Sequence, residues 1–499
     1  MTPRPLRLLA FSHSANFGGS EQLLLQLVRE LAGDHEVACT VVVPGEGRLA
    51  EALRSAGLEA WIWPSRWWCT VGPFDSKAAR ETLAAGASEV LRGLRDARSF
   101  DPDAVLSITT VIPWGGLTAA LLGKPHLWYI TDFGGRSRFP PEYYLPFEEV
   151  RTALREGTDR LFVVSRAVQD RLFADYEVPP PVVPPHLPSP PLGVDRSDRT
   201  SSGAPRLAIL GNVRRAKGHW DAAAALAELS RRGLEAELVL VGYAEERETE
   251  ELLEHAGRLG VQHRLQVLGA VHDQLPWIAS SDIVLVPSHE ETFSLVCLEA
   301  HLHAKPLVAT RVGGIVEFVH DGVNGLTVPA GDPQALAAAV ERLLRDPELA
   351  RRLGEEGRRQ ALRRFTSQGF SGRVRRMLEE VVATGRRCAA PAPLLAPLEA
   401  LAAEHRDLRQ VLGEEQRVCK DLRKASQEAE VRLARAQAQR LRITARAARL
   451  RRELRAQRRR SRVAESGARE LEETLARISS TRGWRLLQMY WRLATRLRE

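Results

Sequence analysis

The sequence is poor in cysteine, and the cysteines that it has form no pattern. Five of them are scattered over 499 residues, at positions 39, 69, 297, 388 and 419, and no two stand in a Cys-x-x-Cys pair. Paired or regularly spaced cysteines are the usual sign of a zinc site or of a disulfide framework. Their absence argues against both and favours a protein of the reducing cytosol.

Long apolar runs are also missing. No stretch approaches the roughly 18 to 20 apolar residues that a membrane-spanning helix needs. The opening segment, MTPRPLRLLAF, is apolar only briefly before SHSANFGG begins, so it is too short for a secretory signal and predicts a buried first strand. With 44% hydrophobic residues, the composition is that of a globular protein, which we expect in the cytoplasm.

Lysine is rare, with six residues against 65 arginines, and the positive charge is confined to one segment. The net charge is +8, but residues 431–462 contain thirteen arginines and one acid, a local charge of +12, which leaves −4 for the rest. A general nucleic-acid surface would spread its charge more widely, and this segment lacks the interleaved aromatic residues that stack on bases. Nucleic acid is therefore the least favoured partner.

The sequence does contain a repeated alternation of short β-type runs and helical patterns, which is typical of parallel α/β layers. The first series of predicted strands is LRLLAF, EVACTVVVP, DAVLSIT, HLWYIT and RLFVVS, and the second is PRLAILG, AELVLVG, HRLQVLG, DIVLVPS and PLVATRV. Between them lies VPPPVVPPHLPSPPLGVD, whose prolines can continue neither a helix nor a central strand.

This alternation predicts an α/β fold with two Rossmann-like domains that face each other across a cleft, where open sheets of this type bind ligands. A chain of 499 residues is too long for a single core, which agrees with several domains. We place the first domain, with its proline-rich linker, at residues 1–195 and the second at 196–385.

After residue 385 the composition changes. Residues 386–398 are an Ala- and Pro-rich linker, and residues 399–478 follow a heptad pattern that predicts a coiled coil, Arg-rich in its second half. Because the polar residues His405, Glu415 and Arg440 fall on the heptad core, a solvated single helix is the alternative. Residues 479–499, with Trp484 and Trp491 on one broad face, predict an amphipathic helix that lies on a membrane or packs on the coiled coil.

The first stretch with a chemical signature is LGNVRRAKGHWDAAAALAEL, a predicted strand, short loop and helix. Two glycines, Gly211 and Gly218, bracket three cations, Arg214, Arg215 and Lys217. A strand-to-helix turn offers free backbone N–H groups and the positive end of a helix dipole, which together with cations suit a diphosphate. The G-x-x-x-x-G-K-[ST] phosphate loop is absent. A solvated basic loop is the alternative.

The second such stretch is PSHEETFSLVCLEA, residues 287 to 300. It holds Glu291 and Glu299, eight positions apart, and Ser294 is placed as the N-cap of a helix. The first carboxylate would then stand just before the helix and the second two turns inside it. Two surface glutamates on a core helix are the alternative.

Together with GGSEQ after the first strand and the segment AKPLVATRVGGIVEFVHDGVNGLTVPAGD, these stretches resemble the retaining family-4 glycosyltransferases of the GT-B fold. The resemblance covers about residues 5–385 and is most specific over 282–332. It implies that Glu291 reaches hydroxyls of a donor sugar and that Glu299 holds the nucleotide ribose. The donor-binding residues that it implies are Gly18, Gly19, Arg214, Arg215, Lys217, Val271, Glu291, Phe293, Ser294, Leu295 and Glu299.

The sequence departs from the family pattern in two places. Asn212 stands where members often carry Arg, so Arg214 or Arg215 must supply that charge. In WYITDF, Asp132 lies near the position where many members carry a catalytic His, and we take it as the substitute, with a loop cap as the alternative. The catalytic set is therefore Glu291, Lys217 and Asp132.

A retaining transfer without an obvious carboxylate nucleophile must rely on stabilising the leaving group. Lys217, an arginine and the helix dipole would bear the charge that develops on the diphosphate. Neither the residues nor the resemblance calls for a metal or another cofactor. The acceptor is expected on the first domain near Gly18, Gly19 and WIWPSRWWCTVGPFD, where Trp67 and Trp68 could stack on a sugar, dip into lipid or pack between domains.

The sequence thus predicts a cytoplasmic glycosyltransferase, peripheral on the inner face of the cytoplasmic membrane, that moves a sugar from a nucleotide-diphosphate donor to a glycan or lipid-linked glycan. A coiled-coil tail ending in SSTRGWRL is similar to tails of some bacterial surface-polysaccharide enzymes. The tail would contact anionic membrane and offers a homodimer interface. The alternative is a non-catalytic GT-B scaffold that acts through its coiled-coil tail, and donor hydrolysis would distinguish the two.

Overall fold

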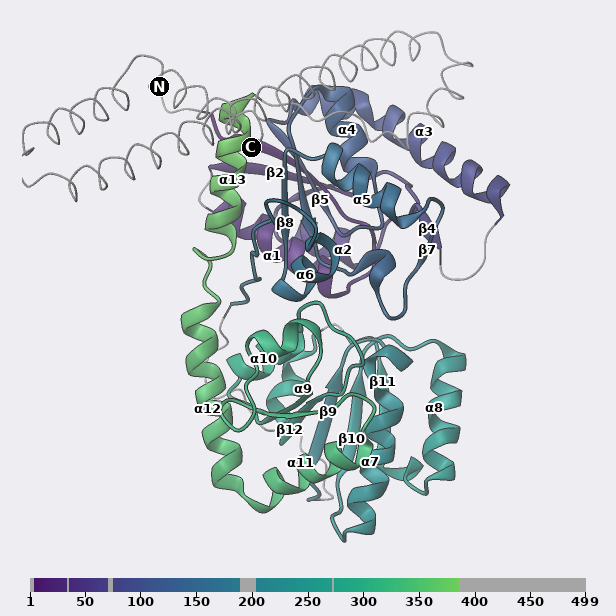
Figure 1. Cartoon of the computed structure of the whole chain (residues 1–499), viewed down its shortest axis with the longest axis vertical. Helices are drawn as coiled ribbons and strands as arrows, with labels where there is room; N and C mark the ends of the chain where they lie inside the picture. The colour runs from purple at the N-terminus through teal and green to yellow at the C-terminus, as the bar shows by residue number, and fades with distance from the viewer. Residues whose placement is uncertain (1–3, 34–35, 71–74, 189–202, 272, 386–499) are drawn as a thin grey trace, which may run out of the picture. The chain divides into compact units, whose positions relative to one another are not determined.

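The structure is a computed structural model that describes residues 4–33, 36–70, 75–188, 203–271 and 273–385 (Figure 1). The predicted linker 386–398, coiled coil 399–478 and terminal helix 479–499 lie outside the described residues, as do positions 189–202 of the proline-rich connection. All described residues belong to one compact unit.

The first half of this unit is built on a six-stranded parallel sheet with the order β3-β2-β1-β5-β6-β8. Its strands are β1 (Leu6–Phe11), β2 (Val37–Val43), β3 (Glu59–Ile62), β5 (Ala104–Ile108), β6 (His126–Ile130) and β8 (Arg160–Val163). Leu8 pairs with Cys39 on one side and Ala104 on the other, so β1 is central. The strands are Val- and Leu-rich because a parallel sheet is covered on both faces.

Helices and short elements surround this sheet. They are α1 (Gly19–Gly33), α2 (Arg48–Ser55), α3 (Ser76–Phe100), α4 (Trp114–Leu122), η1 (Gly134–Arg136), α5 (Phe147–Glu156) and α6 (Arg166–Phe173). A separate antiparallel pair joins β4 (Cys69–Thr70) to β7 (Glu142–Tyr143). This pair fixes the aromatic loop after β3 to the loop after β6.

The second half repeats the plan with the parallel sheet β11-β10-β9-β12-β13-β14. Its strands are β9 (Arg206–Leu210), β10 (Glu237–Val241), β11 (Leu265–Gly269), β12 (Ile283–Val286), β13 (Leu307–Thr310) and β14 (Leu326–Val328). The helical elements are η2 (Arg215–Lys217), α7 (His219–Arg231), α8 (Glu246–Arg258), η3 (Gln262–Arg264), α9 (Leu275–Ser280), α10 (Leu295–Leu302), η4 (Gly313–Glu317), α11 (Pro333–Arg345), α12 (Pro347–Arg364) and α13 (Ser371–Thr384).

The prediction of an α/β fold with two Rossmann-like parallel sheets is confirmed. In each sheet the chain winds outward from a central strand, then returns and winds the other way, so β1/β5 and β9/β12 are the points where the order reverses. Ligands of open parallel sheets bind outside the carboxyl ends of the strands at such points. The loops after β1, β5, β9 and β12 are therefore where a site is expected.

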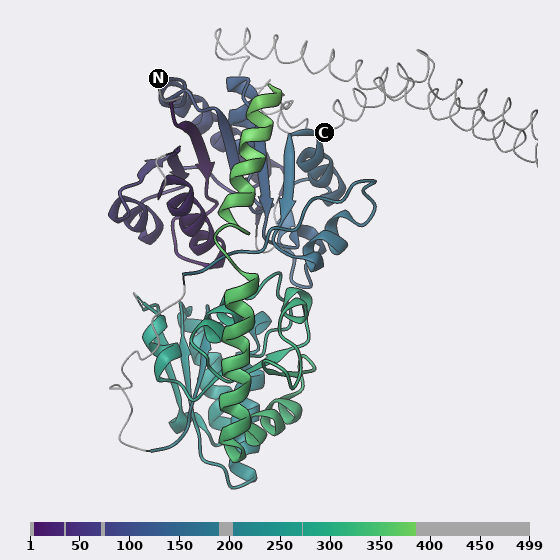
Figure 2. The same ribbon diagram turned by 90° about the vertical axis from the view of Figure 1, so that its left-hand side faces the viewer.

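The last two described helices connect the halves. Helix α12 packs on α10 of the second half, whereas α13 packs on α1 of the first, and both are drawn in green in Figure 2. Arg373 on α13 donates a hydrogen bond of 2.8 Å to the carbonyl oxygen of Val182, and Arg160 lies 2.7 Å from Glu380. The chain thus enters the second half and returns to the first.

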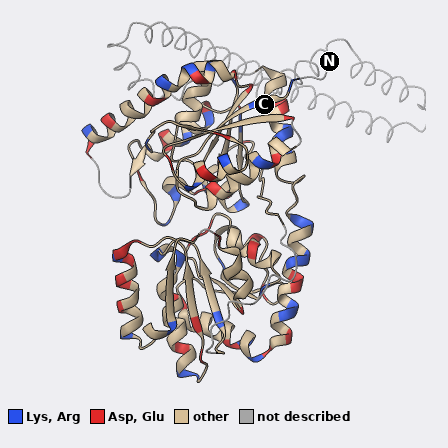
Figure 3. Ribbon diagram, turned by 180° about the vertical axis from the view of Figure 1, so that it is seen from behind, with Lys and Arg blue, Asp and Glu red and all other residues tan. Residues whose placement is uncertain are grey.

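The outer helices carry charges of both signs. Figure 3 shows this on α12, where Arg351 lies 2.6 Å from both Glu348 and Glu355. Such pairs on one exposed helix face contribute little stability each and keep the face in water. Every helix in the described part of the chain is too short or too polar to cross a lipid bilayer.

Candidate active site

Glu291 lies in the loop between β12 and α10 and contacts the cation predicted to accompany it. Lys217 Nζ donates to Glu291 Oε1 at 2.5 Å, and Ser288 Oγ donates to the same oxygen at 3.0 Å. The Glu291 side chain is 10% exposed, and that of Lys217 is 39% exposed. The structure therefore brings together the two stretches that the sequence singled out, because they follow β9 and β12, which are neighbours in one sheet.

Glycines allow this close approach. Gly218, between η2 and α7, has a φ of +74°, and a Cβ there would stand 2.0 Å from the carbonyl oxygen of Pro287. Gly313 has a φ of +47°, and a Cβ there would stand 1.7 Å from the carbonyl oxygen of Glu291. Only glycine fits at either position. Two glycines therefore set how tightly residues 211–218 (the basic loop) and η4 pack on residues 287–294 (the glutamate loop).

Helix α10 begins where the sequence predicted. Ser294 is its N-cap, and Ser294 Oγ accepts a hydrogen bond of 3.2 Å from the N–H of Cys297. Within the described residues, the N–H groups of Phe293, Ser294 and Leu295 have no hydrogen-bond acceptor. The buried Phe293 ring stacks on Phe318, with ring centroids 4.9 Å apart, and this anchors the loop. Free N–H groups at a helix start form an anion site.

Glu299 is inside α10, 3% exposed, and accepts hydrogen bonds from two glutamine amides. Gln22 Nε2 on α1 donates at 2.7 Å, and Gln274 Nε2 before α9 donates at 3.2 Å. Burial raises the pKa of the Glu299 carboxyl from 4.5 to about 7 against the effect of these bonds. A carboxylate that is held by neutral amides can exchange them for the hydroxyls of a ligand.

The glutamate loop also contacts the first half of the unit. Glu290, whose side chain is 11% exposed, accepts hydrogen bonds from Arg171, from the hydroxyl of Ser137 and, at 2.9 Å, from the N–H of Arg138. Thr292 Oγ1 donates at 2.8 Å to the carbonyl oxygen of Thr131. The loop around Glu291 is therefore anchored to both sheets.

The start of α1 faces the start of α10. Gly18 N donates to Glu21 Oε2 at 3.1 Å, and a Cβ on Gly19 would lie 3.8 Å from Leu295 Cδ1. Glu21 is buried, and its other oxygen lies 2.8 Å from Nδ1 of His13. The Gly-Gly pair thus lies beside the start of α10, and its contact with a donor stays a prediction.

Three predicted donor-binding residues lie at the edge of this arrangement. Arg215 stacks its guanidinium on Trp220 at 4.5 Å and lies 3.4 Å from Glu251, so its charge already has partners. Arg214 is exposed and forms no ion pair with a described residue, which makes it the available cation of the loop. The carbonyl oxygen of Val271 accepts a 2.6 Å hydrogen bond from Arg48 of the first half.

Asp132 has the geometry of a loop cap. Its carboxylate accepts hydrogen bonds from Thr110 N at 2.7 Å, from Gly134 N at 2.8 Å and from the Thr110 hydroxyl, and burial raises its pKa. The cap holds a strained turn, because the β-branched Thr109 has a φ of +71°. The alternative reading of Asp132 is the one that these contacts support, and a contact with substrate stays a prediction.

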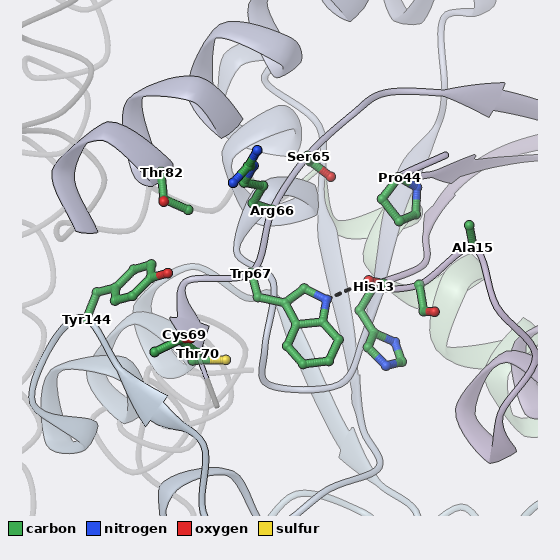
Figure 4. A pocket seen from close by; sticks show the side chains of 11 residues that line it. His13, Ala15, Pro44, Ser65, Arg66, Trp67, Cys69, Thr70, Thr82 and Tyr144 are labelled. Atoms are coloured by element: carbon green, nitrogen blue, oxygen red, sulfur yellow. Dashed lines mark hydrogen bonds between the residues drawn. The ribbon is translucent and has the colours of Figure 1, made fainter. Parts of the chain in front are cut away.

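The two predicted acceptor-binding tryptophans are placed differently. Trp67 lines a cavity of about 500 Å³ next to His13, and its indole N–H donates to the His13 carbonyl oxygen at 2.7 Å (Figure 4). Trp68 is 1% exposed and donates to the carbonyl oxygen of Thr110 at 2.7 Å, so its ring belongs to the core. Of the pair, Trp67 is the residue that a ligand in this cavity can reach.

Several site residues escaped the sequence analysis: His13, Gln22, Gln274, Ser288 and Glu290. Gln22 is part of GGSEQ and Ser288 of PSHEE, so both stand inside recognised stretches. Gln22 and Glu290 have their partners far away in sequence, Glu299 for Gln22 and Arg138 N for Glu290, and nothing local indicates those contacts. Across the described ranges, no group of three or more His, Cys, Asp or Glu residues could hold a metal ion.

Two parallel sheets of the same winding order are the architecture of the GT-B fold. Comparisons with known proteins agree. Residues 17–186 match a family described as Glycosyltransferase Family 4, and residues 204–346 match one described as Glycosyl transferases group 1. The two matches divide between the two sheets.

The relatives match over part of their length. An alpha-D-kanosaminyltransferase from Streptomyces kanamyceticus is 35% identical over 153 residues, 30% of this chain and 39% of the relative. The lipopolysaccharide core biosynthesis glycosyltransferase LpsE of Rhizobium meliloti is 33% identical over 181 residues, 36% of this chain and 52% of the relative. The chain thus spans about half the length of these relatives or less.

The solved structure of Anabaena HepE in complex with UDP and glucose has the same fold. Its TM-score against this chain is 0.59 with 20% sequence identity, and the superposition covers 75% of this chain and 100% of that one. The likeness extends over both sheets and places no ligand in this chain.

Proposed function

We propose that the protein is a glycosyltransferase that takes a sugar from a nucleotide-diphosphate donor and transfers it with retention of configuration. The observation that carries the proposal is the contact of 2.5 Å between Lys217 and Glu291 beside the free N–H groups that open α10. A cation, a carboxylate and a helix start at one point suit a ligand with both phosphate and hydroxyl groups. The matched glycosyltransferase families support it.

We assign each part of the donor to different residues of the site. Lys217 and Arg214 would neutralise the diphosphate together with the N–H groups of Ser294 and Leu295. Glu291 would accept hydrogen bonds from sugar hydroxyls, and Glu299 would exchange the amide of Gln22 or Gln274 for the ribose hydroxyls. Because HepE is solved with UDP and glucose, a uridine nucleotide is the first donor to test.

The chemistry follows from where charge develops. When the sugar leaves, negative charge grows on the diphosphate, and Lys217 would stabilise this charge and so lower the barrier for departure. One such group is typically worth about 3 kcal/mol, or roughly a hundredfold in rate. We assign the role of the cation to Lys217 and Arg214 and expect no metal cofactor.

We propose a glycan or lipid-linked glycan of bacterial surface polysaccharide as the acceptor. The role of LpsE in lipopolysaccharide core biosynthesis supports this class. Residues 399–499 would hold the enzyme on the inner face of the cytoplasmic membrane through the +12 of residues 431–462, and their heptads would form a homodimer.

The proposal is tested by following UDP release from UDP-glucose and other UDP-sugars, with and without an added acceptor. The full chain should turn over at least one UDP-sugar, and Glu291→Gln should lower the rate at least a hundredfold. Glu250→Gln is the matched control, because Glu250 is an exposed glutamate on the outer helix α8. A protein that binds no nucleotide sugar and hydrolyses none is the non-catalytic scaffold.

A further inference from the structure

We propose that the cavity of about 500 Å³ beside the β1–α1 loop is the acceptor site and that Arg66 selects an acceptor sugar with a phosphate or a carboxylate (Figure 4). This inference rests on the proposed transferase function and adds the chemical class of the acceptor. It follows from how the walls of the cavity are fixed and from the charge that they present.

Three indole groups fix three consecutive residues of the wall. Trp114 Nε1 donates to the carbonyl oxygen of Arg66 at 2.6 Å, and Trp67 Nε1 donates to that of His13 at 2.7 Å. Trp68 Nε1 donates to that of Thr110 at 2.7 Å. Because Trp114 and Trp68 are fully buried, the backbone of residues 66–68 is held to the core. A binding surface that is already ordered loses little conformational entropy when a ligand arrives.

The segment that follows is held from the other side. Cys69 pairs with Tyr143 and Thr70 with Glu142 in the small antiparallel sheet, and Tyr144 N donates to the carbonyl oxygen of Trp68 at 3.0 Å. Tyr144 also lines the cavity, and Figure 4 labels it together with Trp67. Residues 66–70 are thus held in place by hydrogen bonds from both sides.

The lining has the composition of a carbohydrate site. The Trp67 ring, 5.5 Å from that of His13, offers an apolar face for a sugar ring. Ser65, Thr70 and Thr82 also line the cavity and carry hydroxyl groups. An apolar face with several surrounding hydroxyls suits a ligand that has C–H groups on one face and hydroxyls at its edge.

Arg66 gives the cavity a positive charge. It is exposed and forms no ion pair with any described residue, whereas Arg54 nearby in sequence lies 2.7 Å from Glu46. The described lining contains no aspartate or glutamate. A guanidinium group offers paired donors that match the two oxygens of a carboxylate or phosphate. The charge of the cavity is therefore complementary to an anionic sugar.

The cavity adjoins the donor site through one short loop. His13 lines the cavity and lies 2.8 Å from the buried Glu21, which also accepts from Gly18 N. Gly19 lies beside the start of α10, since a Cβ built on it would be 3.8 Å from Leu295 Cδ1. Residues 13–19 thus have the cavity at one end and the start of α10 at the other. A transfer between two bound sugars requires that their sites lie this close together.

Saturation-transfer NMR on the full chain tests the inference with three probes: glucose, glucose 6-phosphate and glucuronic acid. At low salt the two anionic sugars should bind at least tenfold more tightly than glucose. Arg66→Ala should reduce both to the level of glucose, and Arg66→Glu should weaken them further. Arg29→Ala is the matched control, since Arg29 is an exposed arginine on α1 outside the cavity, and it should change nothing.

Two outcomes separate the sources of the anion, and others overturn the inference. Tighter binding of the phosphate sugar assigns a phosphorylated acceptor, and tighter binding of glucuronic acid assigns a uronic acid. Equal binding of glucose and both anionic sugars, or an Arg66→Ala protein with wild-type affinities, would overturn it. UDP binding in the same samples should be unaffected by Arg66→Ala, and a chain that binds no UDP would overturn the proposed function separately.

Discussion

If Glu299 holds the ribose as proposed, the affinity for the nucleotide depends on whether its carboxyl group is protonated. Burial raises the pKa of its carboxyl to about 7, although Gln22 and Gln274 donate to it. In the proposed site the ionised form would accept hydrogen bonds from ribose hydroxyls at both oxygens, and the protonated form would lose one of these. We therefore expect UDP affinity to rise with pH, by at most about tenfold per pH unit, and to level off above about pH 7. Calorimetry across this range measures it.

The control for this prediction is Glu299→Gln, a neutral side chain of the same shape. It should bind UDP more weakly than the wild type and with a smaller dependence on pH. An identical pH slope in both proteins would show that another group titrates.

The same residue affects stability. Its folded pKa of about 7 lies above the ordinary value of 4.5, so the folded state binds the proton more tightly than the unfolded chain does. The contribution of Glu299 to the free energy of unfolding is thus fully present below about 4.5 and is lost as the pH rises through about 7. Urea titrations at two pH values should show that Glu299→Gln loses less stability over this interval than the wild type.

At the scale of elements, Gly218 sets how the basic loop, residues 211–218, packs on the glutamate loop, residues 287–294. Gly218→Ala places a Cβ 2.0 Å from the Pro287 carbonyl oxygen and also strains a φ of +74°. Gly233→Ala is the matched control, because Gly233 has a φ of +73° and nothing within 4 Å of a Cβ. The control should cost about 1 kcal/mol of unfolding free energy, and Gly218→Ala about 3 kcal/mol or more. Thermal unfolding distinguishes them, and equal losses would contradict the packing.

Most elements of the two sheets could be predicted from the sequence because their signal is local. Each of the ten predicted strands lies on an observed one, and Ser294 caps α10 as expected. Strands β3, β4, β7 and β14 were missed. They are two to four residues long, so they show too few alternations to recognise, and they exist because a partner strand lies beside them.

The candidate site could likewise be predicted only where local sequence patterns indicate its residues. Lys217 and Glu291 belong to recognisable stretches and meet in the structure. The Gln22–Glu299 hydrogen bond joins residues 277 positions apart, and no local pattern indicates such a contact. Asp132 was chosen from its position at a strand end, where a capping carboxylate and a catalytic one look alike in sequence.

At the scale of the whole molecule, Glu290 helps hold the two halves in register. It is 11% exposed, and Arg171, Ser137 and Arg138 N donate to it across the halves. Glu290→Ala leaves these donors without their acceptor and should lower the free energy of unfolding by about 1 to 3 kcal/mol. This loss is smaller than for a fully buried ion pair because the Arg171 side chain is 38% exposed. It should also raise the KM for the donor, because the neighbouring Glu291 loses one anchor.

A double-mutant cycle checks that the pair is responsible. Glu290→Ala and Arg171→Ala should cost less together than the sum of their separate effects. Glu46→Ala, which removes an exposed ion pair with Arg54, should change the stability little. Full additivity of the two variants would contradict a direct bridge.

The basic C-terminal segment gives a prediction about location. Residues 431–462 carry +12, and each basic residue close to an anionic surface contributes about 1 kcal/mol, less at high salt. The full chain should therefore sediment with anionic liposomes at low salt and be released at high salt. A chain shortened to residues 1–390 should stay in the supernatant and still hydrolyse the donor. Loss of hydrolysis on shortening would require another role for the tail.

The most direct test of the donor site is UDP affinity, measured by calorimetry in four proteins. UDP has the diphosphate and ribose of a donor but no sugar, so Lys217→Ala and Glu299→Ala should each weaken its binding about tenfold or more. Glu291→Gln should bind UDP nearly as the wild type does, because Glu291 is assigned to the sugar, and yet should turn over a UDP-sugar at least a hundredfold more slowly. Wild-type UDP affinity in Lys217→Ala, together with wild-type turnover in Glu291→Gln, would contradict the assignment of this site.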